Sequence, residues 1–339
     1  MNYFTSDKNS IFFIAEIGGN HEGDFEYAKK LLRLAVESGA DAVKFQIYCG
    51  DTLVSRIESP EGNKHFKKFE LGKDQYILLA KMCQDSGVMF MASIWDFDRL
   101  AWVDDYVSIH KIGSGDVTSY PLIKRMVKSG KPIILSTGLC TIDEVRETVT
   151  YIKSLDEDYI TEKRLALLQC TAAYPCPDED ANLNAMLLLR NEFGLPVGYS
   201  DHTVGNDAVF AAAAMGAEII EMHFTDTREG KSFRDHKISI TKDELIDILE
   251  KIRKVKRLQG KYAKKSTSSE IKAGHVSSFR RSVYAKCDIR KGETFTDDNL
   301  TILRPEHGIP ANRFEELLGK KAERDLKEHE VLRDTDLTQ

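Results

Sequence analysis

The sequence lacks any apolar run long enough to span a lipid bilayer. None of its uninterrupted apolar stretches approaches the ~20 residues that a transmembrane helix needs. The N-terminus, MNYFTSDKNS, also lacks the basic segment and the long apolar core of a secretory signal. We therefore expect a cytoplasmic protein with no membrane partner.

Cysteine and basic charge are also limited. The six cysteines are scattered without the spacing of a zinc knuckle, so we interpret them as reduced thiols. The net charge of −6 leaves no basic excess to attract a polyanion, which argues against nucleic-acid binding. A hydrophobic fraction of 42% with 30% charged residues is typical of a globular chain with a sizeable core.

Short apolar runs alternate with amphipathic stretches through the first 260 residues. Eight runs have the composition of buried parallel strands: IFFIAEI (11–17), DAVKFQIY (41–48), VMFMASI (88–94), VSIHKIG (107–113), KPIILST (131–137), ALLQCTA (166–172), PVGY (196–199) and AEIIEMHF (217–224). A long polar insertion to about residue 72 follows the second run. Eight evenly spaced units predict an α/β fold, a (β/α)8 TIM barrel. An open, doubly wound sheet is the alternative, although it does not require eight such units.

The amino-acid composition of the chain changes after Gly260. Residues 261–277 are polar and serine-rich, which predicts a linker. Residues 278–339 combine short strand-like pieces with a short helix, ANRFEELLG, and are numerous enough for a small domain. We therefore predict a barrel domain over 1–260, a linker, and a C-terminal domain in which no catalytic constellation is visible.

Two histidines mark the predicted seventh and eighth strands. His202 and His223 end apolar runs joined by an alanine-rich helical stretch, so the right-handed βαβ unit brings both to one sheet edge. Each could simply cap its strand and bond a backbone carbonyl. Their pairing in one unit, with Asp201 beside the first, predicts a divalent-metal or acid/base site.

Polar side chains occur at the end of every predicted strand. Lys44 and Lys111 lie inside apolar strands, where a buried ammonium needs a counter-charge from an anionic ligand or from a carboxylate such as Glu16. Either lysine alone could snorkel to solvent. Together with the Ser/Gly turns at 113–115 and 136–138, the two lysines predict a cradle for a phosphate or a carboxylate-phosphate.

Eight motifs carry a resemblance to a known family. The motifs AEIGGNHEG, GADAVKFQ, KIGSGD, ILSTG, CTAAYPCP, GYSDHTVG, GAEIIEMHFT and DHKIS occur in this order. They resemble the sialic acid (N-acetylneuraminate) synthase family, which includes legionaminate and pseudaminate synthases. The tail, FRRSVYAKCDIRKGETFTDDNLTILRPEHGI, is similar to that family's antifreeze-like (SAF) domain.

The resemblance implies a nonulosonic acid synthase. Such an enzyme condenses phosphoenolpyruvate with an open-chain N-acylated hexosamine by C–O cleavage, releasing phosphate and a nine-carbon 2-keto-3-deoxy acid. It also implies Mn²⁺ or Mg²⁺ on His202 and His223, with Glu16 handling protons. The substrate-binding residues that it implies are Lys44, Gln46, Ser93, Lys111, Ser114, Ser136, Tyr174, Ser200, Asp235 and Arg304.

The resemblance further implies a domain-swapped homodimer, because Arg304 in LRPEHGI matches an arginine that reaches the partner's active site. Three departures bear on the identity of the sugar. Met222 stands where a lysine is usual, Ala172 where a polar residue is usual, and SIWDF (93–97) replaces a Ser-Thr-Pro-Phe-Asp run. We expect Met222 to remove a charge near the metal site.

Two other functions remain open. One is a phosphoenolpyruvate-dependent synthase that extends arabinose or erythrose phosphates, which would need a further anion site. The other is a non-catalytic surface or spore-coat polysaccharide protein that keeps the fold, although Glu16 and both metal-type histidines are present.

Overall fold

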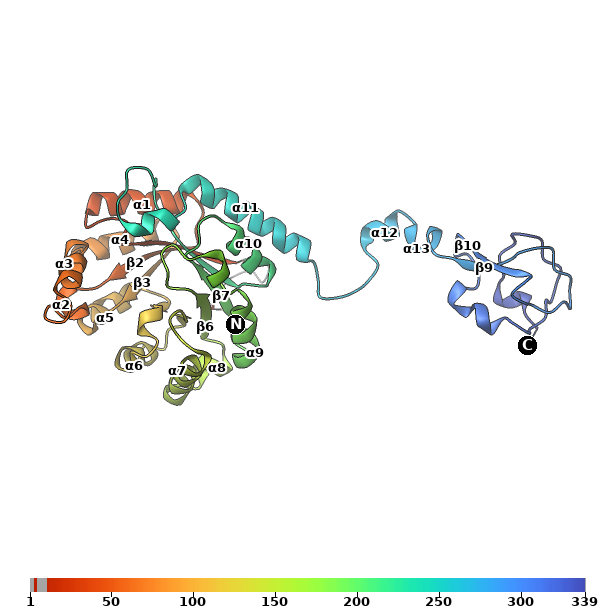
Figure 1. The fold of residues 1–339 in the computed structure, drawn as a ribbon, viewed down its shortest axis with the longest axis horizontal. Helices are drawn as coiled ribbons and strands as arrows, with labels where there is room; N and C mark the ends of the chain where they lie inside the picture. Colours follow the sequence, from red (N-terminus) through yellow and green to blue (C-terminus); the bar gives the residue numbers. More distant parts are fainter. Residues whose placement is uncertain (1–2, 5–10, 339) are drawn as a thin grey trace. The chain divides into compact units, whose positions relative to one another are not determined.

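The computed structural model describes residues 3–4 and 11–338 and divides the chain into two compact units, Met1–Gly260 and Lys261–Gln339 (Figure 1). In the first unit, eight parallel strands close into a barrel in the order β1 to β8. The strands are β1 (Phe12–Gly18), β2 (Ala42–Ile47), β3 (Met89–Ile94), β4 (His110–Ile112), β5 (Ile133–Ser136), β6 (Leu165–Cys170), β7 (Val197–Asp201) and β8 (Ile219–His223). The (β/α)8 barrel predicted from the repeated strand–helix pattern is confirmed.

Helices surround the barrel, as Figure 1 shows. Those that connect successive strands, or follow the last one, are α1 (Phe25–Glu37), α4 (Lys73–Asp85), α5 (Phe97–Val103), α6 (Tyr120–Lys128), α7 (Ile142–Leu155) with α8 (Asp158–Thr161), α9 (Asn184–Phe193), α10 (Asp207–Ala214) and α11 (Lys242–Gln259). The polar insertion after β2 is not merely a loop. It forms α2 (Gly50–Leu53) and α3 (Pro60–Lys68), which lie at the carboxyl end of the barrel strands and line its pocket.

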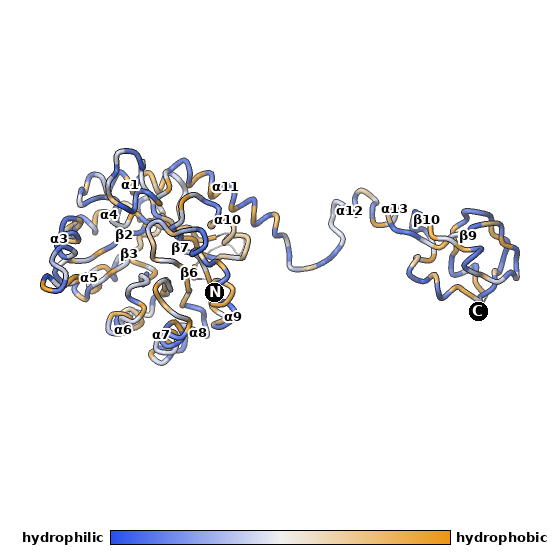
Figure 2. The backbone as a smooth tube through the Cα atoms, viewed as in Figure 1, coloured by the Kyte–Doolittle hydropathy of each residue, from blue (hydrophilic) through white to orange (hydrophobic). Residues whose placement is uncertain are grey.

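Local signals in the sequence begin the helices. The carboxylate of Asp24 accepts a hydrogen bond from the backbone N–H of Tyr27 at the start of α1. Thr141 and Glu144 form a capping box at the start of α7. In Figure 2 hydrophilic and hydrophobic segments alternate along α11, whose inner face buries Leu245 and Ile248 against the barrel.

The barrel interior is layered from apolar to polar. The layers toward the amino-terminal ends of the strands are filled by apolar side chains: Phe12, Ile14, Ala42, Met91, Ile109, Ile134, Ala166, Leu168 and Ile219. Gly198 belongs to this tight packing, because a Cβ at this position would lie 2.2 Å from the carbonyl oxygen of Ile219. Since alternate strand residues face the same side, the next inward residues toward the carboxyl ends are polar, for example Glu16 after Ile14.

The second unit has its own small core around Val283, Phe295 and Leu326. It contains α12 (Ser268–Lys272), α13 (His275–Ser278) and an antiparallel pair formed by β9 (Ser282–Ala285) and β10 (Leu300–Leu303). The stretch 261–277, predicted as a linker, carries α12 and most of α13. A capping box between Thr267 and Glu270 begins α12.

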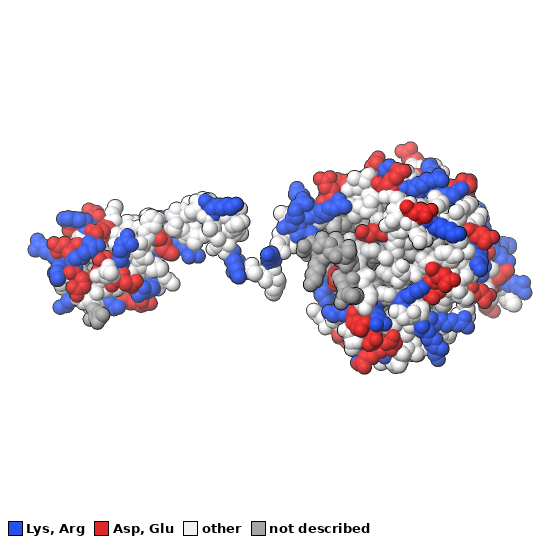
Figure 3. Space-filling view, turned by 180° about the vertical axis from the view of Figure 1, so that it is seen from behind, with Lys and Arg blue, Asp and Glu red and all other residues white. Residues whose placement is uncertain are grey.

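The helices and the surface show how apolar and charged residues are distributed in the folded protein. In the part of the chain that the structure describes, no helix is both long enough and apolar enough to cross a membrane. On the face drawn in Figure 3, basic and acidic side chains are interspersed rather than separated into large fields of one sign.

Candidate active site

A cavity of about 400 Å³ opens at the carboxyl ends of the barrel strands, the usual place for a site in this fold. Twelve of the predicted site residues line it: Glu16, Lys44, Gln46, Ser93, Lys111, Ser114, Ser136, Tyr174, Ser200, His202, His223 and Asp235. Arg304, the other predicted residue, belongs to the second unit, where its guanidinium lies 5.4 Å from the centre of the Phe279 ring.

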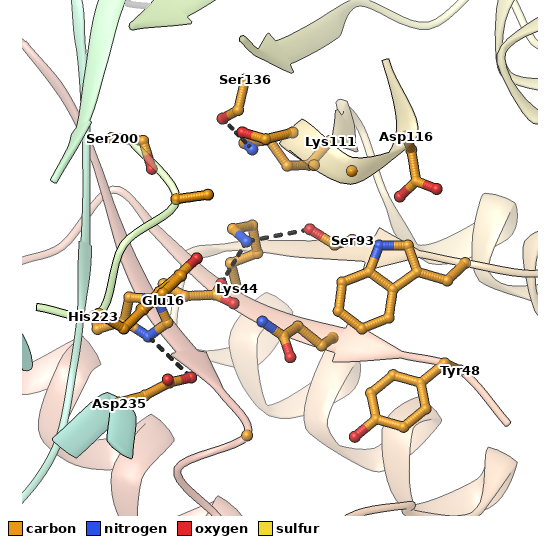
Figure 4. Close-up of a pocket in the computed structure, with 18 of the residues that line it drawn as sticks. Glu16, Lys44, Tyr48, Ser93, Lys111, Asp116, Ser136, Ser200, His223 and Asp235 are labelled. Carbon is orange, nitrogen blue, oxygen red and sulfur yellow. Dashed lines mark hydrogen bonds and ion pairs between the residues drawn. The ribbon is translucent and has the colours of Figure 1, made fainter. Parts of the chain in front are cut away.

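Two lysines and two carboxylates form the buried centre of the cavity. Nζ of Lys44 lies 2.6 Å from Oε2 of Glu16 and 3.7 Å from Oε2 of Glu221, and Nζ of Lys111 lies 3.6 Å from Oε1 of Glu221. Figure 4 shows Lys44 between Glu16 and Ser93. The counter-charge that these lysines require thus comes from the protein itself, so their burial alone does not demand an anionic ligand.

The two carboxylates titrate in opposite directions. Burial raises the pKa of Glu16 to about 7, although Lys44 opposes the rise. Burial also disfavours the charged form of Glu221, but Lys111 and Lys44 outweigh it and lower the pKa of this carboxyl to about 2. Glu221 is therefore ionised at neutral pH, whereas Glu16 exchanges a proton there. With Glu16 neutral, two ammonium groups face one carboxylate, and the centre carries an excess positive charge.

Serine hydroxyls hold the charged groups in place. Lys111 donates to Oγ of Ser136 at 2.7 Å, and Lys44 donates to Oγ of Ser93 at 3.2 Å. Ser200 donates to Oε1 of Glu221 at 3.1 Å. These hydroxyls and ammonium groups, which come from neighbouring strands, are the donors that bind a phosphate or a carboxylate.

Two imidazoles lie beside this buried centre. The rings of His202 and His223 have centroids 5.4 Å apart. Nδ1 of His202 lies 2.8 Å from the carbonyl oxygen of Thr171, so in the neutral ring Nδ1 carries the proton and Nε2 is a free acceptor. Burial lowers the pKa of His202, but Cys170 and the Thr171 carbonyl outweigh it and raise that pKa above its usual value. Burial, reinforced by the neighbouring His202, lowers the pKa of His223 well below its usual range. The free Nε2 of the neutral His202 ring and the lowered pKa of His223 keep a ring nitrogen of each available as a ligand.

The residues present fit a divalent ion that is only partly held by protein. Nδ1 of His223 is buried without a hydrogen-bond partner among the described residues and lies 3.9 Å from Oδ2 of Asp235. No group of three or more His, Cys, Asp or Glu side chains suited to a metal occurs in residues 3–4 and 11–338. Two imidazoles suit Mn²⁺ or Mg²⁺ only where waters or substrate complete the coordination.

Neither of the two neighbours of the histidines that the sequence singled out lines the cavity, and the prediction that Met222 removes a charge there is wrong. Asp201, which follows Ser200 and precedes His202, is not in the lining of the cavity. Its Oδ1 accepts hydrogen bonds from the Tyr199 hydroxyl and the Thr203 N–H. Met222 lies in the apolar layer between barrel and helices, so its presence removes no charge from the cavity. Strand alternation explains this orientation, since Glu221 and His223 face inward on either side of Met222. Ala172 does line the cavity.

Sequence reasoning missed Glu221 and the aromatic wall. Glu221 lies two residues before His223 on the same strand, and this spacing predicts that both side chains face the same side of the sheet. Tyr48 stacks on Trp95 with centroids 5.2 Å apart, and Phe66 packs edge-on against Tyr48. Trp95 stands in the SIWDF departure, but only the folded insertion shows that Phe66 reaches it.

An arginine on the rim was also missed. The guanidinium of Arg234 lies 4.6 Å from the centre of the Tyr174 ring, and the Tyr174 ring lies 4.2 Å from that of His202. Arg234 also donates from Nε to Oδ1 of Asp235 at 3.1 Å. The residue sits in FRDHKIS, one place before the predicted Asp235.

Three sugar-acid synthases from other organisms are similar to this protein over almost the whole chain. An N,N′-diacetyllegionaminic acid synthase of Campylobacter jejuni is 38% identical over 95% of this chain and 98% of its own length. An N-acetylneuraminate-9-phosphate synthase of Mus musculus is 34% identical over 93% of this chain and 89% of its own length. A pseudaminic acid synthase of Campylobacter jejuni is 31% identical over 98% of both.

A solved structure and family models agree with these relatives. The crystal structure of an N-acetylneuraminic acid (sialic acid) synthetase from Leptospira borgpetersenii matches with a TM-score of 0.73 and 31% identity, covering 79% of this chain and 91% of that one. Residues 280–338 match the SAF domain model. Residues 31–264 match the NeuB family model, and the chain belongs to the NeuB family.

Proposed function

We propose that this chain is a nonulosonic acid synthase that condenses phosphoenolpyruvate with an open-chain N-acylated hexosamine. C3 of phosphoenolpyruvate bonds to the aldehyde carbon, water adds at C2, and the C2–O bond to phosphate breaks. The products are phosphate and a nine-carbon 2-keto-3-deoxy acid. The names of the similar synthases, for legionaminic, pseudaminic and N-acetylneuraminic acid-9-phosphate, support this class of sugar-acid transferase.

One observation carries the proposal. A single cavity combines a buried ammonium–hydroxyl cradle around Lys44 and Lys111 with the imidazoles of His202 and His223 and the carboxylate of Asp235. Figure 4 labels Lys44, Lys111, His223 and Asp235 of this set. The cradle suits a small dianion, and the imidazole side suits a carbonyl that must be polarised. Because both groups belong to one cavity, C3 of an anionic enol ester bound at the lysines would lie close to an aldehyde bound at the imidazoles.

The residues would divide the work as follows. Lys44 and Lys111 bind the phosphoenolpyruvate anion with Ser93, Ser114, Ser136 and Ser200, and Gln46 and Tyr174 complete the lining. Glu16, whose pKa lies at about 7, moves protons near the reacting carbons. Asp235 accepts hydrogen bonds from the sugar hydroxyls.

Metal chemistry would be confined to the imidazole side. His202 and His223 would hold Mn²⁺ or Mg²⁺, which supplies Lewis-acid polarisation of the acceptor aldehyde when bound. The protein keeps His223 neutral by burying it, so the ring does not have to lose a proton before it binds a cation.

The second unit would complete the site in a domain-swapped homodimer. Arg304 is proposed to reach the acceptor sugar bound by the partner subunit, with residues 261–277 as the connection and 278–339 as the SAF domain. The residues 280–338 that match the SAF model support these boundaries.

A panel assay tests the proposed function against the two alternatives. Phosphate release from phosphoenolpyruvate is measured with N-acetylmannosamine, its 6-phosphate, other N-acetylated hexosamines, arabinose 5-phosphate and erythrose 4-phosphate. The proposal predicts release only with N-acylated hexosamines. Release with arabinose or erythrose phosphates would favour the second synthase class, and no release with any acceptor would favour a non-catalytic protein.

A further inference from the structure

A second cavity, of about 540 Å³, adjoins the first. It lies between the C-terminal part of α3 and the loop that precedes the short 3-10 helix η4 (Arg234–Ile238). Five residues line both cavities: His65, Phe66, Phe69, Phe233 and Arg234. We call this second cavity the aromatic annex. Because the two cavities share a wall, a molecule that fills the first can extend into the annex.

The floor of the annex is aromatic. The ring centroids of Phe69 and Phe233 are 4.7 Å apart, and His65 lies 4.8 Å from Phe69 and 6.1 Å from Phe233. Gly19 makes room for this packing, since a Cβ there would lie 3.1 Å from the Phe233 ring. Such a floor offers apolar contact and flat ring faces to a ligand.

The charges around the annex differ from those of the lysine cradle. Its cations, Lys68 and Arg234, are exposed, and Arg234 already bonds Asp235. Glu22 adds a carboxylate to the wall, 3.1 Å from Nε2 of His236. A phosphate here would meet aromatic rings and a carboxylate, with only solvent-screened cations to offset its charge. A neutral amide or methyl group would meet no such cost.

The position of the annex identifies the part of the acceptor that reaches it. Phe233 and Arg234 directly precede Asp235, which lies 3.9 Å from His223. With the aldehyde at the histidines and the anionic enol ester at Lys44 and Lys111, the remaining carbons of an extended sugar can pass Asp235, which also lines the first cavity. The annex is the cavity on that path.

We propose that the aromatic annex binds the end of the acceptor sugar remote from its aldehyde, and that it selects neutral acylamino or deoxy substituents there over a phosphate ester. Phe233 is the specificity-determining residue, because its ring lines both cavities and forms the floor with Phe69. The selection rests on the proposed function, in that the acceptor is taken to be an N-acylated hexosamine.

The wild-type protein gives the first test. At saturating phosphoenolpyruvate, kcat/KM is compared for N-acetylmannosamine, a 2,4-diacetamido-2,4,6-trideoxyhexose and N-acetylmannosamine 6-phosphate. The neutral acceptors should exceed the phosphate ester by roughly tenfold or more, the range expected when a pocket discriminates one substituent. Equal or higher efficiency with the 6-phosphate would overturn the selection and leave the proposed synthase activity intact. No turnover with any acceptor would instead refute the synthase activity, and the selection with it.

Two variants locate the selection at Phe233. Phe233→Ala should lower kcat/KM for the best neutral acceptor by roughly tenfold, narrow its advantage over the phosphate ester, and leave the KM for phosphoenolpyruvate unchanged. Phe233→Tyr, which keeps the ring, should retain most of the efficiency. Phe97→Ala is the matched control, because Phe97 is also a partly exposed phenylalanine, 39% exposed, but lines neither cavity.

The variants can also contradict the assignment. If Phe233→Ala and Phe97→Ala behave alike, or if Phe233→Ala raises the KM for phosphoenolpyruvate as much as that for the sugar, Phe233 does not determine acceptor specificity. Thermal unfolding of each variant shows whether a lost activity reflects a lost fold, and the wild-type comparison stands whatever that measurement gives.

Discussion

The ammonium nitrogen of Lys44 lies 2.6 Å from Oε2 of Glu16, and both side chains are at most 4% exposed. Water cannot screen this pair, so the protonation state of Glu16 sets how much of the Lys44 charge an incoming anion meets. When Glu16 is ionised, Lys44 is already paired. When Glu16 is neutral, Lys44 is free to attract the phosphoenolpyruvate anion.

Phosphoenolpyruvate binding should therefore weaken as the pH rises through about 7, the pKa of Glu16. Burial raises this pKa from its ordinary value of 4.5, so the neutral form dominates below 7 and is lost above it. Calorimetric titration with phosphoenolpyruvate from pH 6 to 8 measures the effect. Glu16→Gln should bind with a shallower pH dependence while losing turnover. The same pH dependence in wild type and variant would assign the titration to another group or to the ligand.

Replacing Lys111 by Met should raise the KM for phosphoenolpyruvate roughly tenfold to a hundredfold, the loss expected for a charged hydrogen bond. The KM for the sugar should change little. Glu221 keeps Lys44 and Ser200 as partners in this variant, which limits damage to the fold. Lys44→Met should likewise raise the KM for phosphoenolpyruvate more than that for the sugar. Its loss of stability should be larger, because it removes the positive charge that compensates the buried carboxyl groups of Glu16 and Glu221.

Steady-state kinetics with each substrate varied in turn checks both lysine variants. Lys124→Met, at an exposed position on α6, is the control and should match wild type. Equal rises in both KM values would point to general damage of the barrel rather than to an anion cradle.

Alanine at His202 or His223 should lower kcat by roughly a hundredfold or more, equivalent to about 3 kcal/mol of activation free energy. Chelation of the wild-type protein should have the same effect, reversed by added Mn²⁺ or Mg²⁺. Metal content measured by elemental analysis should fall in both variants and stay at the wild-type level in His329→Ala, whose histidine is exposed in the second unit. Full activity in chelator would exclude the metal role.

Mixing an Arg304→Ala chain with a Glu16→Ala chain tests the swapped homodimer. Each chain alone should be nearly inactive. In a swapped heterodimer one site carries both defects and the other neither, so activity should return after subunit exchange. If heterodimers form, as native mass spectrometry can show, and activity does not return, Arg304 acts within its own chain or not at all.

Much of the fold could be predicted because the barrel repeats one local pattern. Each buried strand is an apolar run, and helices such as α1, α7 and α11 begin at a capping residue, so the number of units followed from residues close together in the chain. The strand-end rule then brought Glu16, Lys44, Lys111 and both histidines to one cavity.

What could not be predicted depends on contacts between distant segments. Phe66 and Phe69 lie in the insertion after β2, and their approach to Trp95 and Phe233 results from how that insertion folds over the rim. Nothing local distinguishes them from other aromatic residues. Met222 was a different kind of error, since the period of the strand was available and would have turned it outward.

The fate of the bridging oxygen of phosphoenolpyruvate tests the proposed condensation most directly. Phosphoenolpyruvate labelled with ¹⁸O between C2 and phosphorus is incubated with the protein and an accepted N-acylated hexosamine, and both products are analysed by mass spectrometry. C–O cleavage predicts that the label appears in phosphate and that the nine-carbon acid takes its 2-keto oxygen from water. Label missing from the phosphate, or phosphate formed without a nine-carbon acid, would contradict the condensation.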